Sequence, residues 1–271
     1  NYDLKKLLVI VVVNNALDDS TEIIEDNIES IELINNFDSL YTLRCIDAST
    51  DLHALPVKFS GVGYSRKIGM DFALKYSESN TIFHCLDADT IISSRYLEKI
   101  NNIYTKKQPK ALTVNFEHQM DSDNRINKYI RDYEIFLKTT AKNIRKANSH
   151  YGYVSLGPTI TCLSQTYVDI GGMVNKKATE DFYFLQQIRK FTKIYFLDEK
   201  LVFPSSRLSD RVYLGTGFRM NQSVKGENIQ DLYYSDKSFL ILKRTLETSG
   251  VKLPERIDIP EFMEMDILEK E

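Results

Sequence analysis

The sequence predicts an α/β fold with a mostly parallel sheet flanked by helices. The first observation is a set of unbroken apolar runs, such as residues 7–13, which are typical of strands covered on both faces. The second is that these runs alternate with segments of helical periodicity, in the order βαβαβαβ through residue 116. With 271 residues, 42% of them hydrophobic, the chain can also bury a full core.

The pattern places each element in turn. Strands are predicted at residues 7–13, 40–46, 81–86, 111–116, 154–163 and 194–203. Helices are predicted over 24–34 after the capping Ser20, from about Ser65, over 94–103 and 124–144, from Thr179, and again after Ile229. Residues 204–219 contain Gly, Ser and three arginines and are predicted to form a loop.

Composition excludes several classes of protein. A net charge of −3 argues against a broad nucleic-acid-binding surface. Cys45, Cys85 and Cys162 are far apart in apolar runs, so we expect buried thiols in a reducing compartment rather than disulfides or zinc. The longest apolar run is too short to cross a bilayer, and a cytoplasmic protein is expected. The first residue, Asn1, is compatible with a piece of a longer polypeptide.

The strand at 81–86 leads directly into Asp87-Ala88-Asp89. Open α/β sheets bind ligands at the carboxyl ends of their strands, and two carboxylates there suit Mg²⁺ or Mn²⁺ together with a nucleotide. A second Asp-x-Asp, at Asp121 and Asp123, follows no strand and precedes an amphipathic run, so it is predicted to be a loop and helix N-cap. The turn after the first strand lacks glycine, which disfavours a dinucleotide-dependent dehydrogenase.

Each of three further features has two interpretations, one functional and one structural. Arg66 and Lys67, expected in the first turn of a helix, suit a bound anion such as a diphosphate, or they point to water. Glu180 and Asp181 are expected at the start of a helix. In one interpretation they are there because the helix dipole stabilises acidic side chains at that end, and in the other they supply a catalytic carboxylate. The arginines of residues 204–219 belong either to a loop that closes over an anionic donor or to a solvated loop.

Together these residues resemble family 2 glycosyltransferases, which have the GT-A fold, over residues 7–217. The resemblance rests on Asp47, Arg66, Asp87-Ala88-Asp89, Gly171-Gly172 and Glu180-Asp181, in that order and spacing. It departs from the family pattern at Val12, Val13, Asn14 and Ala48, which leaves the identity of the nucleotide open.

The resemblance implies a role for each matching position. The expected nucleotide- and donor-binding residues are Asn15, Asp47, Ser49, Arg66, Asp87, Ala88 and Arg211, with Asp87 at the ribose. Asp89, with Asp87 alongside, is expected to bind the metal. Asp181 matches the family's general base, with Glu180 as its neighbour and the fallback choice. Arg211, in a Ser-Asp-Arg and Gly-Thr-Gly region similar to that of some bacterial members, carries no specific role.

The implied function is Mn²⁺- or Mg²⁺-dependent hexosyl transfer from a nucleotide-sugar donor, a UDP-sugar, to a hydroxyl of a glycan or glycolipid acceptor. It implies inversion with Asp181 as the base, although retention stays open, and a place in bacterial surface polysaccharide or glycoconjugate synthesis. The alternatives are a sugar nucleotidyltransferase, which normally carries a basic Gly-rich loop after its first strand that is missing here, and a non-catalytic nucleotide-sugar or glycan-binding module.

The expected domain organisation is one main domain with a C-terminal extension. Residues 1–220 would form the GT-A domain, with a nucleotide-sugar half at 1–117 and an acceptor half at 118–220. Residues 221–271 would form a helical extension with an acidic tail. Its aromatic-rich helix is expected to pack on the core, and the alternative is peripheral contact with the inner face of the membrane. The oligomeric state stays open.

Overall fold

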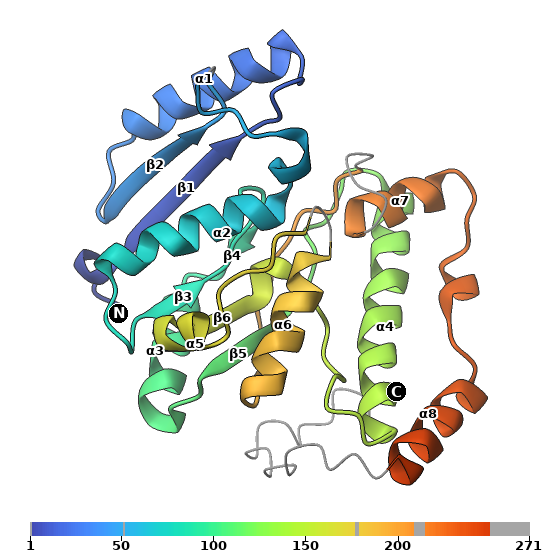
Figure 1. Ribbon diagram of the computed structural model, residues 1–271. Helices are drawn as coiled ribbons and strands as arrows, with labels where there is room; N and C mark the ends of the chain where they lie inside the picture. Colours follow the sequence, from blue (N-terminus) through green and yellow to red (C-terminus); the bar gives the residue numbers. More distant parts are fainter. Residues whose placement is uncertain (1, 51, 177–178, 209–214, 250–271) are drawn as a thin grey trace. The chain divides into compact units, whose positions relative to one another are not determined.

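The computed structural model describes residues 2–50, 52–176, 179–208 and 215–249 (Figure 1). The chain forms two compact units, each assembled from separate segments. The first unit contains Asn1–Phe83, Leu97–Gln108 and Cys162–Phe184. The second contains His84–Tyr96, Pro109–Thr161 and Leu185–Glu271. The domain boundaries expected from the sequence, at residues 117 and 220, stay a prediction.

The first unit is built on a parallel strand pair. β1 (Leu8–Asn14) pairs with β2 (Thr42–Ala48) along its whole length, from Leu8 opposite Thr42 to Asn14 opposite Ala48. Helices α1 (Thr21–Asn35) and α2 (Val62–Ala73) pack against these strands (Figure 1). The Ser20 hydroxyl caps α1, as predicted, by accepting a hydrogen bond from the Ile23 N–H. α2 begins three residues before the predicted start, since Gly61 is its N-cap.

A second sheet has the strand order β3-β6-β5-β7-β4. Its strands are β3 (Ile82–His84), β4 (Ile91–Ile92), β5 (Ala111–Phe116), β6 (Ile160–Leu163) and β7 (Tyr195–Phe203). β5 and β7 are parallel, whereas the two-residue β4 runs antiparallel to β7. The predicted mixed, mostly parallel α/β class is confirmed, but the described strands form two sheets where the sequence suggests one.

The core of the second unit surrounds β5, all six residues of which are buried, as expected for a strand covered on both faces. The long helix α4 (Asn124–Lys146) packs against α7 (Thr216–Val224) and α8 (Asp236–Thr248) (Figure 1). Apolar side chains of α4, α7 and the 3-10 turn Ile229–Leu232 form a buried cluster of Ile130, Tyr133, Met220 and Ile229. The segment predicted as one helix after Ile229 is therefore divided: its 3-10 turn and Tyr233 pack on this cluster, whereas α8 itself contributes no buried residue.

The Asp121 and Asp123 pair is the loop and cap that the sequence predicts. The Asp123 carboxylate accepts a hydrogen bond of 2.8 Å from the Arg125 N–H at the start of α4. Two other elements also follow the prediction closely: α3 (Tyr96–Lys107) and α6 (Glu180–Phe191).

Other elements depart from the prediction. Only the last four residues of the run at 154–163 form a strand, because residues Gly157–Thr159, with Pro158 at the centre, form a 3-10 turn. α5 (Ser164–Asp169) and α7 arise where the sequence indicates strand end or loop. Cys85 and Cys162 are buried thiols outside any disulfide, but Cys45 is only partly buried. Within the described residues, no helix combines the length and apolar character needed to cross a membrane.

Candidate functional site

Asp47 ends up where the sequence places it, at the carboxyl end of β2 in the first unit. Its carboxylate accepts hydrogen bonds from the Ser49 N–H at 2.9 Å, the Ser49 hydroxyl at 3.0 Å and the Thr50 N–H at 3.0 Å, and also from the Thr50 hydroxyl. Burial by itself would raise the pKa of Asp47, but the hydrogen bonds from Thr50 and Ser49 outweigh it and hold the pKa at about 2. Asp47 is therefore a fixed, ionised acceptor at this strand end.

Asn15 lies at the neighbouring strand end, after β1. Its side chain is buried, and its amide oxygen accepts a hydrogen bond of 2.8 Å from the side chain of Asn27 on α1. Its carbonyl oxygen accepts a hydrogen bond of 3.0 Å from the Leu55 N–H. In this structure Asn15 and the buried Ser49 support the turns that carry the strand ends, and direct contact of either residue with a donor stays a prediction.

Arg66 and Glu180 form a buried ion pair in the first unit. The Arg66 guanidinium donates through Nη1 to Oε1 of Glu180, and the two side chains are only 10% and 5% exposed. Arg66 lies in the second turn of α2, not the first, and Lys67 next to it donates to Asp71 at 2.8 Å. The structure thus joins two of the predicted site residues, which lie 114 positions apart in the sequence.

Gly63 makes this pairing possible. A Cβ atom at Gly63 would lie 2.6 Å from the carbonyl oxygen of Lys176 and 2.7 Å from Cβ of Glu180. Real side chains do not approach this closely, so only glycine lets the first turn of α2 contact the segment before α6. Because Arg66 lies three residues after Gly63, on the same face of the helix, it points to Glu180 as well.

Glu180 and Asp181 have different environments although they are adjacent. Glu180 is buried against Arg66, whereas Asp181 is half-buried, and its carboxylate accepts a hydrogen bond from the Phe182 N–H at 2.7 Å. The residue before them, Thr179, has a φ of +65°. Positive φ is rare for a β-branched residue, and such strain concentrates at functional sites. Of the two acids, Asp181 is the more exposed.

Asp87, Ala88 and Asp89 form one tight turn at the carboxyl end of β3, in the second unit. The Thr90 N–H donates to the carbonyl oxygen of Asp87 at 3.0 Å, which closes the turn. Both aspartates are half-buried and Ala88 is exposed. The structure therefore presents the two carboxylates from a strand end, as the sequence predicts.

Asp89 also has a partner that the sequence does not indicate. Nε of Arg207 lies 2.9 Å from Oδ2 of Asp89, with the two side chains 56% and 34% exposed. Arg207 belongs to the arginine-containing segment after β7, whose predicted donor-binding residue Arg211 lies outside the described residues. In this structure the Arg207 guanidinium therefore balances the charge of the Asp89 carboxylate.

The residues of this turn fit a hard divalent cation. Carboxylate oxygens are the donors that Mg²⁺ and Mn²⁺ prefer, and one or two of them suffice where water and phosphate oxygens complete the shell. The described part of the chain has no group of three or more His, Cys, Asp or Glu side chains placed to hold a metal. Asp87 and Asp89 are the residues of this turn that could hold such a cation, and Asp89 is paired with Arg207 in this structure.

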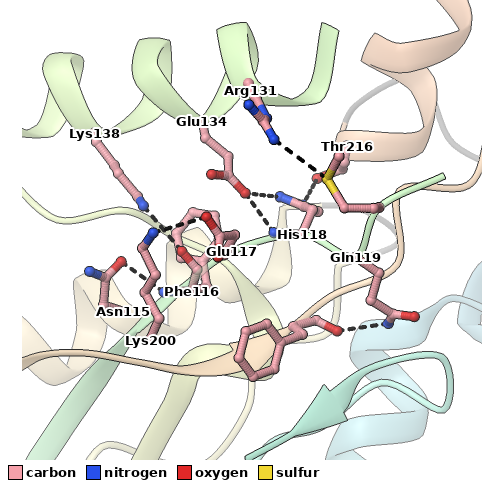
Figure 2. Close-up of polar contacts among 12 residues, drawn as sticks. Asn115, Phe116, Glu117, His118, Gln119, Arg131, Glu134, Lys138, Lys200 and Thr216 are labelled. Atoms are coloured by element: carbon pink, nitrogen blue, oxygen red, sulfur yellow. Dashed lines mark hydrogen bonds and ion pairs between the residues drawn. The ribbon is translucent and has the colours of Figure 1, made fainter. Parts of the chain in front are cut away.

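Two functional candidates that the sequence analysis misses follow β5 in the second unit. The Gln119 side chain donates to the carbonyl oxygen of Asp89 at 2.8 Å. His118 lies between Glu134, 2.7 Å from its Nδ1, and Thr216, 3.3 Å from its Nε2 (Figure 2). Both residues lie within three positions of the end of a buried strand, the same signal that singles out Asp47 and Asp87, and that signal could have found them.

The predicted site residues are divided between the two units. Asn15, Asp47, Ser49, Arg66, Glu180 and Asp181 belong to the first unit, and Asp87, Ala88 and Asp89 belong to the second.

Comparisons with known proteins give a distant likeness only. No protein-family model and no curated protein matches the sequence. Among solved structures, the chain is similar to S. aureus TarS 1-349, with 16% identity and a TM-score of 0.48 over 76% of this chain and 53% of that chain. It is also similar to TarS 1-349 in complex with UDP-GlcNAc, with 15% identity and a TM-score of 0.49 over 92% of this chain and 67% of that chain.

A complex of TarS 1-349 with UDP gives 14% identity and the same TM-score of 0.49, over 92% of this chain and 65% of that chain. The chain spans about half of the length of the first of these structures, 53%. Likenesses of this degree establish neither a shared family nor a shared activity, so the function rests on the residues of this chain.

Proposed function

We propose that this protein is a metal-dependent glycosyltransferase that moves a sugar from a nucleoside-diphosphate donor, a UDP-sugar, to a hydroxyl of a glycan or glycolipid acceptor. The observation that carries the proposal is the Asp87-Ala88-Asp89 turn at the carboxyl end of β3. Its accessible carboxylates suit a divalent cation that also binds phosphate oxygens, and parallel α/β sheets bind nucleotides at this edge. The family resemblance of the sequence motifs points to the same chemistry.

The proposed base is Asp181. Glu180 is a poor choice, since its buried carboxylate is already bound to the Arg66 guanidinium and is not accessible to an acceptor hydroxyl. Asp181 accepts the proton of the acceptor hydroxyl while the hydroxyl oxygen forms a bond to the anomeric carbon. The bond from that carbon to the phosphate oxygen breaks, and the nucleoside diphosphate leaves with the electron pair. One displacement of this kind inverts the anomeric configuration.

The other residues bind and orient the donor. Asp47, fixed by Ser49 and Thr50, is a hydrogen-bond acceptor for the nucleobase, and Asp87 is an acceptor for the ribose. Mn²⁺ or Mg²⁺ at Asp89, with Asp87 alongside, would neutralise the negative charge of the diphosphate.

A thermal-shift panel of nucleoside diphosphates and nucleotide sugars, with and without Mn²⁺, tests the donor. A ligand that binds only the folded protein stabilises it by about 2.7 kcal/mol at a concentration 100 times its Kd. We expect a rise in Tm with one nucleotide class only, dependent on Mn²⁺ and lost in Asp89→Asn. Asp123→Asn is the matched control, because it changes the second Asp-x-Asp and asparagine is as good an N-cap as aspartate. A panel without any shift would contradict the proposal.

Asp181→Asn tests the base. We expect this variant to keep the Mn²⁺-dependent shift and to lose sugar transfer, because only the proton acceptor is removed. Product analysis separates the rival activities: a glycosyltransferase releases a nucleoside diphosphate, a sugar nucleotidyltransferase releases pyrophosphate, and a binding module releases neither. Full transfer activity in Asp181→Asn would show that another group is the base.

A further inference from the structure

Gln119 connects two main-chain segments of the second unit at the candidate metal site. Its side-chain nitrogen donates to the carbonyl oxygen of Asp89 at 2.8 Å and to the carbonyl oxygen of Phe203 at 2.7 Å. A primary amide has two N–H donors, and here each has one acceptor. Gln119 therefore joins the Asp87-Ala88-Asp89 turn to the end of β7.

One carbonyl acceptor of Gln119 belongs to Asp89 itself, and the other belongs to the segment that carries Arg207, the ion-pair partner of Asp89. β4 pairs with β7 through Ile91 opposite Phe203, and this two-residue ladder ends there. Four residues after Phe203 comes Arg207, whose Nε lies 2.9 Å from the Asp89 carboxylate. Gln119 thus connects the Asp89 turn to the segment after β7 at the position where the pairing of β4 with β7 ends.

The Gln119 backbone is itself fixed from two sides. The N–H groups of Glu117 and Gln119 donate to the carbonyl oxygens of Val202 at 3.1 Å and Pro204 at 2.8 Å, which continues the parallel pairing of β5 with β7. Successive side chains of an extended chain point in opposite directions. Figure 2 shows His118 directed toward α4 and Gln119 directed away from it.

The His118 side holds the segment against the helices. Oε1 of Glu134 accepts from the His118 N–H at 2.6 Å and lies 2.7 Å from Nδ1 of the imidazole, whose side chain is fully buried. Nε2 lies 3.3 Å from the hydroxyl of Thr216, the first residue of α7. Gln119 therefore extends from a rigid base, which is what a residue needs in order to orient another.

We propose that Gln119 is a positioning residue for the metal ligand Asp89: it fixes the main chain of the Asp87-Ala88-Asp89 turn and sets the direction of its carboxylates. The inference rests on the proposed function, in which Asp89 binds the metal. Groups that orient metal ligands typically contribute 10–100-fold to metal affinity or activity.

Gln119→Met tests the proposal, because methionine keeps the length and volume of glutamine but has no N–H donor. We expect the dissociation constant for Mn²⁺ with UDP to rise about 10–100-fold in isothermal titration calorimetry. Transfer should recover at saturating Mn²⁺, so that the apparent KM for the metal rises more than kcat falls. Hydrogen exchange of the Thr90 amide, which closes the turn, should become faster without ligand.

Gln222→Met is the matched control. Gln222, on α7 of the same unit, donates through its side chain to Glu227 at 3.1 Å and not to the Asp87-Ala88-Asp89 turn. We expect this variant to bind Mn²⁺ and UDP like the wild type. If Gln119→Met also binds like the wild type and keeps slow Thr90 exchange, the role of Gln119 is overturned while the proposed function stands. A wild-type protein that does not bind Mn²⁺ and UDP overturns both.

Discussion

Nε of Arg207 lies 2.9 Å from the Asp89 carboxylate, so an arginine holds the aspartate that the sequence assigns to a metal. A cation at this carboxylate must leave, or move aside, before a metal binds. Both side chains are substantially exposed, and an exposed ion pair of this kind contributes at most about 1 kcal/mol.

Arg207→Gln should therefore tighten the binding of Mn²⁺ alone, by up to about 5-fold, because a competing cation is removed. Titration of Mn²⁺ without nucleotide, followed by electron paramagnetic resonance, measures this affinity. Arg125→Gln is the matched control, since Arg125 pairs with Asp123 in the other Asp-x-Asp at 2.7 Å. Weaker Mn²⁺ binding in Arg207→Gln would mean that the arginine supports the metal site and does not compete with it.

The Arg66 and Glu180 pair should dominate the stability of the first unit. Removing one partner of a buried ion pair leaves an uncompensated charge, and Arg66→Met alone should lower the free energy of unfolding by about 3–5 kcal/mol. The double variant Arg66→Met/Glu180→Leu should recover most of this loss, because apolar residues of similar volume replace buried pairs well. Urea denaturation of the four proteins in the double-mutant cycle gives the coupling energy. Additive losses would contradict the pairing.

Two glycines of α2 should respond differently to replacement by alanine. In Gly63→Ala the new methyl group would overlap Lys176 and Glu180, so we expect destabilisation of about 1–3 kcal/mol and a displaced α6 start. In Gly69→Ala the new Cβ would lie 3.2 Å from Cγ2 of Val12, a contact that a small shift relieves, while alanine favours the helix. The control should therefore be near neutral. Thermal unfolding of both variants measures the difference, and equal stabilities would contradict the close approach at Gly63.

Asp47 should make the protein sensitive to acid. Its pKa of about 2 in the folded protein is lower than its ordinary value of 3.8, so the unfolded chain binds the proton first as the pH falls. The stabilisation by ionised Asp47 is fully present above about pH 4 and is lost as the pH falls toward 2.

Asp47→Asn should consequently be less stable than the wild type at pH 6, and the difference should shrink as the pH approaches 2. Urea denaturation at pH 6, 4 and 3 measures it. Asp38→Asn, at an exposed position, is the control and should differ little from the wild type at any of these pH values. A difference between Asp47→Asn and the wild type that does not change with pH would show that the Ser49 and Thr50 hydrogen bonds do not favour the ionised form.

The sequence by itself determined most elements and the places where polar residues end a strand. Residues 111–116 were predicted to the residue, and a helix N-cap was predicted within Asp121–Asp123, because continuous burial and capping leave a local signature in the sequence. Gly171 and Gly172 both have positive φ, 82° and 80°, a conformation that glycine adopts without strain. Such features depend on neighbours along the chain.

Only the tertiary structure decided that one of two adjacent acids is buried in an ion pair and the other is more exposed. Glu180 and Asp181 look alike in the sequence, and the difference comes from Arg66, which is 114 residues away from Glu180 and reaches it only because Gly63 allows the close approach. The links from Arg207 and Gln119 to Asp89 are of the same kind. Periodicity reports which face of an element is buried, but contacts between distant side chains depend on how the elements pack, and no local pattern encodes that packing.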